Sequence, residues 1–98
     1  MQKHNPPHPG EIIQEVYVNA FEELTVSSLA RYLNVSASAV SRLLKGQADL
    51  SPVMVIKLAK VLGGSVASWL NLQQSYDIWH ASQLVNTDNL KSFQPKIS

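Results

Sequence analysis

The chain is 98 residues long, with 45% hydrophobic residues, no cysteine and a net charge of +1 at pH 7. These values are typical of one small globular domain, exclude a disordered chain, and give no indication of disulfides or of a thiolate metal site. No apolar run is long enough to span a membrane and no signal-peptide pattern opens the chain, so the expected location is the cytoplasm.

The first nine residues contain three prolines and are predicted to form an irregular arm. Gly10 follows, and a helix is predicted from about Glu11 to Asn19. Its buried stripe is expected to consist of Ile12, Ile13 and Val16, which recur at helical spacing.

Residues 25–46 predict two short amphipathic helices joined by a tight turn. Thr25 can cap the first helix, because its hydroxyl can accept a hydrogen bond from a free amide of the first turn. Asn34 tolerates the left-handed backbone that a chain needs to leave a helix sharply. The apolar positions that form the stripe of the first helix are Val26, Leu29, Ala30 and Leu33.

The second of these helices is predicted to be capped by Ser36 and to end at Gly46. Its buried stripe is expected at Val40, Leu43 and Leu44, with Val35 filling the core between the two helices. Cap, turn and stop all stand where a helix-turn-helix motif requires them, which favours a sequence-specific DNA binder. The alternative is a helical hairpin that serves only as part of a small all-α bundle.

The polar side of the second helix is the candidate DNA face, since the N-terminal residues of a recognition helix lie closest to the bases. Small residues at 37 and 38 would let the backbone approach, and the guanidinium of Arg42 can pair with O6 and N7 of guanine. The predicted DNA-binding residues are Ser36, Ala37, Ser38, Ser41, Arg42, Lys45 and Gln47.

Two further helices complete the predicted fold. Ser51 and Pro52 open one that is expected to run to Leu62, with Val55, Leu58, Ala59 and Leu62 buried. Ser65 caps another, expected to end near Ala81. The sequence therefore predicts an all-α, five-helix domain over residues 10–81, followed by a flexible tail over residues 82–98.

The last predicted helix carries large aromatic side chains. Trp69 is expected to complete the core. Leu72, Tyr76 and Trp79 are predicted to form a dimer interface, because a stripe of aromatic rings on a terminal helix offers much apolar area. The alternative for Tyr76 and Trp79 is that they too complete the core.

Charge is unevenly distributed along the chain. Residues 31–60 contain five lysines and arginines and one acidic residue, Asp49. The only concentrated acidic group is Glu11, Glu15, Glu22 and Glu23. A basic face and an acidic face can therefore coexist, although two ordinary solvated surfaces would give the same pattern.

Three motifs, in order, resemble the HigA-type antitoxins of the Xre and phage-repressor helix-turn-helix group. They are HPGEII at residues 8–13, the helix-turn-helix itself, and SWLNLQQSYDIW at residues 68–79. The resemblance implies a homodimer that represses its own operon by binding double-stranded operator DNA. It also implies direct neutralisation of an mRNA-cleaving toxin of the HigB/RelE kind.

The acidic residues Glu11, Glu15, Glu22 and Glu23 are the predicted toxin-binding surface, because a toxin that cleaves RNA presents cations to phosphate. The alternative to an antitoxin is a freestanding Xre-type transcriptional regulator without a toxin partner.

An enzyme is not expected. His4 and His8 are separated by prolines and do not share a helix face, and no other residues have metal-ligand spacing. No nucleophile motif and no glycine-rich phosphate loop is present. The sequence therefore predicts no cofactor, no metal site and no membrane partner.

Overall fold

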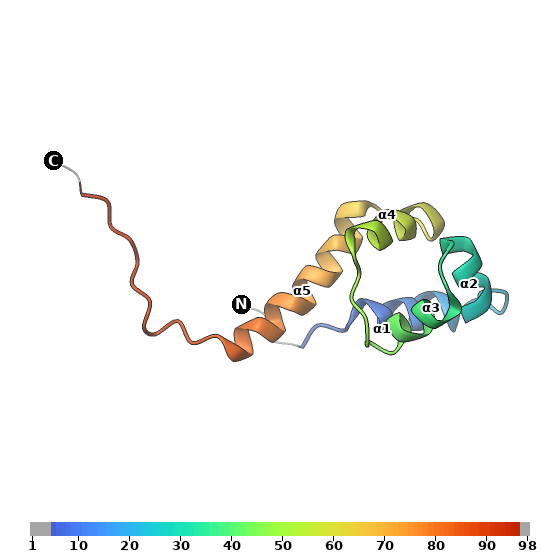
Figure 1. Ribbon diagram of the computed structural model, residues 1–98, viewed down its shortest axis with the longest axis horizontal. Helices are drawn as coiled ribbons and strands as arrows, with labels where there is room; N and C mark the ends of the chain where they lie inside the picture. Colours follow the sequence, from blue (N-terminus) through green and yellow to red (C-terminus); the bar gives the residue numbers. More distant parts are fainter. Residues whose placement is uncertain (1–4, 97–98) are drawn as a thin grey trace.

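Five α-helices and one π-helical turn make up the regular structure of residues 5–96, the part of the chain that the computed structural model describes (Figure 1). In chain order they are α1 (Pro9–Ile13), η1 (Gln14–Val18), α2 (Val26–Leu33), α3 (Ala37–Leu44), α4 (Pro52–Val61) and α5 (Val66–Leu84). No strand forms within these residues, so the predicted all-α fold is confirmed. His4 and parts of the predicted arm and tail, residues 1–4 and 97–98, lie outside the described residues.

The predicted helix caps are present. The hydroxyls of Thr25, Ser36, Ser51 and Ser65 each accept a hydrogen bond from an amide three residues further on. Asn34 ends α2 in the left-handed conformation, with φ 56° and ψ 50°. The two helices of the motif are therefore bounded by local side-chain chemistry, as the sequence indicated.

The first helix differs from the prediction in two ways. It begins at Pro9 rather than at Glu11, and it changes into a π-helical turn in which the amide of Asn19 donates to the carbonyl of Gln14 at 2.8 Å. Such a turn adds one residue to the helical repeat and rotates the side chains that follow. Tyr17 and Val18 pack against the core instead of Val16, which is 53% exposed, so the predicted burial of Val16 is wrong.

The core lies where the faces of α2, α3 and α4 meet α1 and α5. Its fully buried side chains include Ile13, Leu29, Leu33, Val40, Val55 and Leu58. Trp69 on α5 is also buried, and its indole N–H donates to the carbonyl of Gly63 at 2.8 Å. The prediction that Trp69 belongs to the core is confirmed. Ala59 and Leu62, predicted to be buried, are only half-buried.

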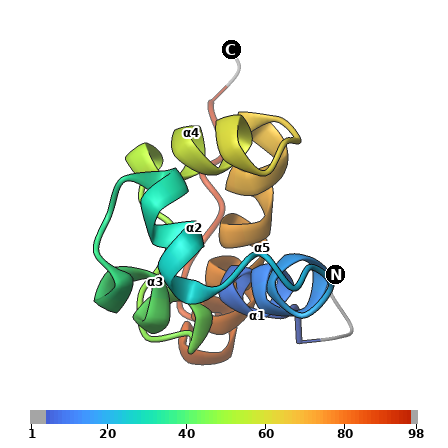
Figure 2. The ribbon, with the colours of Figure 1, turned by 90° about the vertical axis from the view of Figure 1, so that its right-hand side faces the viewer.

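Seen in Figure 2, α4 lies at the top of the domain and α1 and α3 lie at the bottom, with α2 between them. α3 packs against both α1 and α2, and α5 packs against both α1 and α4. α5 continues to Leu84, three residues beyond the predicted end, and the tail then extends away from the domain (Figure 1). No helix in residues 5–96 is long and apolar enough to cross a membrane.

Candidate nucleic-acid interface

The outer face of α3 is open to solvent along its whole length. Ala37, Ser38 and Arg42 are exposed, as are the C-cap residue Lys45 and Gln47 in the loop beyond it. Ser41 is half-buried between the exposed face and the core. The structure therefore brings the predicted DNA-binding residues onto one accessible surface, opposite the side chains that anchor α3 in the core.

Ser36 has two roles on this surface. Its oxygen accepts the amide of Ala39 at 3.0 Å, which caps α3. The hydroxyl proton remains available to donate to a phosphate oxygen, and the positive end of the helix dipole points the same way. The N-terminus of α3 is thus suited to meet the DNA backbone as well as the bases.

Gly10 lets α1 contact the backbone of α3 directly. A Cβ atom added at Gly10 would lie 1.8 Å from the carbonyl oxygen of Leu43. No L side chain can be accommodated at that distance, so the two backbones touch with only a hydrogen atom between them. The orientation of the recognition helix is therefore fixed from behind by the first turn of α1.

His8 fastens α1 to the loop that follows α3. Its ring is buried, and its Nδ1 accepts the amide of Gly10 at 2.9 Å, which caps α1. The opposite nitrogen, Nε2, lies 3.1 Å from Oδ1 of Asp49. Because Nδ1 is the acceptor, Nε2 must carry the proton that is donated to the carboxylate. Asp49, the one acid in the basic stretch of sequence, thus holds the loop in place.

A second tie joins the same loop to α5. The amide of Leu50 donates to Oε1 of Gln73 at 2.7 Å, and Nε2 of Gln73 in turn donates to Asp77 at 2.9 Å. Gln73 is buried, so its amide group has a fixed orientation. Because Asp49 is hydrogen-bonded to His8 and Leu50 to Gln73, the loop that carries Gln47 is held against both α1 and α5.

The predicted dimer residues are already partly covered within one chain. Leu72, Tyr76 and Trp79 are half-buried. The ring of Tyr76 lies between those of His8 and His80, with centroid distances of 4.8 and 4.2 Å. The most exposed apolar side chains of α5 are instead Ile78, at 68%, and Leu84, at 86%.

The four predicted toxin-binding glutamates are all exposed, but they do not form one patch remote from α3. Glu11 borders the same hollow as Lys45 and Gly46, beside the end of the recognition helix. Glu23 borders a different hollow together with Tyr32, a hollow that is also lined by η1 and the end of α4. The acidic and basic residues that are separated in the sequence are therefore only partly separated in the folded domain.

Sequence reasoning missed the residues that position the DNA face from behind, namely His8, Asp49 and Gln73. Histidine is not among the usual cap residues, so His8 by itself gives no cap signal in the sequence. The available signal was Pro9, which is favoured at the first position of a helix and therefore identifies His8 as the cap.

The chain resembles helix-turn-helix proteins over most of its length. The helix-turn-helix family profile matches residues 22–69. YddM of Escherichia coli strain K12, an uncharacterized HTH-type transcriptional regulator, is 42% identical over 93% of this chain and 95% of its own length. The Pseudomonas aeruginosa antitoxin HigA, solved with the higBA promoter, is 30% identical, covers 94% of this chain and 99% of its own, and superposes with a TM-score of 0.79.

A third relative, PA4674 of Pseudomonas aeruginosa, was solved in complex with its operator DNA. It is 34% identical over 81% of this chain and 86% of its own, with a TM-score of 0.76. These similarities span nearly the whole of the domain, including α1 and α5, which lie outside the two-helix motif. The chain therefore belongs to the helix-turn-helix family of DNA-binding transcriptional regulators that includes the HigA antitoxins.

Proposed function

We propose that this protein is the antitoxin of a type II toxin–antitoxin pair. In this proposal it binds and blocks an mRNA-cleaving toxin of the HigB/RelE kind and represses its own operon as a DNA-bound homodimer. The observation that carries the proposal is the match to an antitoxin HigA, solved with its promoter, over 94% of this chain. That match includes the elements on both sides of the helix-turn-helix.

DNA reading is assigned to α3 and the loop after it. Arg42 would pair with a guanine, while Lys45 and the capped N-terminus at Ser36 would hold phosphates. Ala37, Ser38 and Ser41 would allow close approach, and Gln47 would reach the backbone from the anchored loop. Two such surfaces in a dimer read half-sites about 34 Å apart, which a single small module cannot do.

The rival is a freestanding regulator, since the chain is also similar to YddM of E. coli, whose name states an HTH-type transcriptional regulator and no toxin partner. If a short basic reading frame adjoins this gene, its expression with and without this chain separates the two. An antitoxin restores growth that the neighbour arrests, co-purifies with it, and represses a reporter driven by its own upstream DNA. Repression without rescue or co-purification identifies a freestanding regulator.

The dimer is proposed to form through α5, with Trp79 as its centre and Tyr76 and Leu72 beside it. Trp79→Ala is expected to shift the protein towards monomer in sedimentation equilibrium and to weaken operator binding clearly. The melting temperature should fall only slightly, because the removed ring is only half-buried within one chain. Ile56→Ala, on the exposed side of α4, is the matched control and should leave the association unchanged. A wild-type monomer at tens of micromolar, on the order of typical working concentrations, would contradict the proposal.

Toxin binding is proposed to use the acidic residues of α1, η1 and the turn that follows. Glu15→Lys should slow toxin association several-fold at low salt and leave operator affinity unchanged, because rim charges act mainly on association rate. Glu11→Lys should affect both partners, because Glu11 shares a hollow with Lys45. Stopped-flow kinetics at two salt concentrations measures the effect. Unchanged kinetics for Glu15→Lys would place the toxin contact elsewhere.

A further inference from the structure

An aromatic hollow lies at the end of the domain opposite the tail. It has a volume of about 380 Å³, and its lining includes the rings of Tyr17, Phe21 and Tyr32 together with Leu24 and Leu62. Phe21 is 50% exposed and Tyr32 is 65% exposed, so two large rings of one hollow are left open to solvent. Rings left open beside a depression of this size are typical of a surface that binds a partner.

The rim of the aromatic hollow is acidic. Glu23 lines it, and Glu22 is exposed beside it. Among residues 5–96 the one ion pair joins His8 and Asp49, so neither glutamate forms an ion pair in this part of the chain, although Arg31 borders a neighbouring hollow together with Glu23 and Tyr32. The hollow therefore favours an occupant that combines a large apolar side chain with positive charge.

The tail of the chain contains such a segment. Residues 90–96 read LKSFQPK, in which Phe93 stands between Lys91 and Lys96. Phe93 is 85% exposed and Leu90 is 70% exposed, so both side chains are accessible to a partner. Pro95 restricts the backbone to extended conformations, which lowers the entropy cost of docking.

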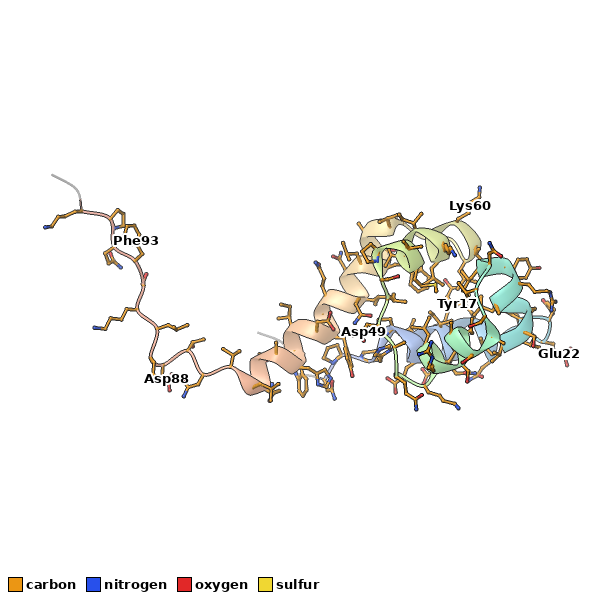
Figure 3. All side chains as sticks on the ribbon, viewed as in Figure 1. Tyr17, Glu22, Asp49, Lys60, Asp88 and Phe93 are labelled. Carbon is orange, nitrogen blue, oxygen red and sulfur yellow. The ribbon has the colours of Figure 1, made fainter. Side chains whose placement is uncertain are left out.

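The distances favour a tail that comes from a second copy. The aromatic hollow includes Val61 and Leu62 at the end of α4, shortly before α5 begins. In Figure 3, Phe93 lies far out on the tail, whereas Tyr17 lies within the helical domain. The 19 residues of α5 carry the chain about 28 Å away from the hollow. Residues 85–93 could span at most about 30 Å, so Phe93 could return to its own hollow only if the tail were fully stretched.

We infer that the segment LKSFQPK of one chain docks into the aromatic hollow of a second copy, with Phe93 among Tyr17, Phe21 and Tyr32 and its lysines beside Glu22 and Glu23. Two chains that exchange tails in this way form a closed, symmetric pair. This contact is separate from the proposed α5 interface and from the DNA face, but it uses Glu22 and Glu23, so a docked tail would compete with a toxin that binds the same two residues.

A labelled peptide of residues 87–96 tests the contact by fluorescence anisotropy. It is titrated with the full-length Phe93→Ala chain, whose own tail cannot compete. We expect saturable binding that becomes at least about tenfold weaker for the Phe93→Ala peptide, because the anchoring ring is lost. The Glu22→Lys/Glu23→Lys chain should also bind about tenfold more weakly, and a Lys91→Glu/Lys96→Glu peptide should restore its binding.

The matched control is the Glu11→Lys/Glu15→Lys chain, which carries the same change of charge away from the aromatic hollow and should keep its affinity for the peptide. Circular dichroism verifies that each variant is folded. The inference would be overturned if the peptide did not bind at all. It would also be overturned if, in low salt, the peptide bound the Glu22→Lys/Glu23→Lys chain as tightly as it binds the chain that keeps both glutamates.

The origin of the tail is tested separately. The chain has no cysteine, so Ala20→Cys and Ser92→Cys can be introduced together and treated with a short bismaleimide cross-linker. Exchange between copies gives covalent dimers whose yield rises with protein concentration. Internally linked monomers at all concentrations would show that the tail folds back on its own chain, and would overturn the assignment to a second copy.

Discussion

Gly10→Ala is expected to destabilise the domain by about 3 kcal/mol or more. The added methyl group would stand 1.8 Å from the carbonyl oxygen of Leu43, and a backbone atom cannot rotate away as a side chain can. Either α1 or α3 must move, and either movement disturbs Ile13 and the contacts of His8 as well. Urea unfolding followed by circular dichroism gives the free energy of unfolding for the variant and the parent chain.

Gly63→Ala is the matched control for this prediction. Gly63 has φ +92° and no atom within 4 Å of an added Cβ, so the substitution introduces backbone strain without a clash. It should cost about 1–2 kcal/mol. If the two substitutions lowered the free energy of unfolding by the same amount, the direct contact between the backbones of α1 and α3 would be disproved. Operator affinity should fall for Gly10→Ala even where the protein is still folded, because α1 sets the orientation of α3.

Arg42→Ala is expected to cost about 1–3 kcal/mol of binding free energy at one base position and to remove the preference at that position. Arg42 is exposed on the outer face of α3, one turn beyond the small residues that allow close approach. Anisotropy titrations with the upstream DNA of the gene, and with single-base variants of it, measure the affinity and the specificity together.

Lys45→Ala provides the contrast. Its ammonium would meet a phosphate, so its removal should weaken binding evenly across sequences and reduce the slope of log affinity against log salt by about one. Equal losses on operator and random DNA for Arg42→Ala would exclude Arg42 from reading bases.

The parts of the fold that local chemistry determines could be predicted from the sequence. Thr25, Asn34 and Ser36 each act on the backbone within one turn of themselves, so their effect could be recognised in the sequence and was found in the structure. The same holds for the exposed face of α3, which follows from the spacing of Val40, Leu43 and Leu44.

Features that depend on contacts between distant segments could not be predicted. The π-helical turn after Ile13 has no sequence signature of its own, and it moved Val16 out of the core. The link between His8 and Asp49 spans 41 residues, and neither residue alone suggests the other. The position of Glu11 beside Lys45 likewise follows only from the packing of α1 on α3.

The ties from His8 to Asp49 and from Leu50 to Gln73 also bear on the order in which the protein folds. Contacts between α2 and α3 close short loops, whereas these two ties close loops of 41 and 23 residues at a greater entropic cost. We therefore expect α2 and α3 to associate early, with the loop after α3 ordered last, once both ends of the domain have docked. A newly made chain would then acquire its paired helices before it acquires a settled surface for DNA.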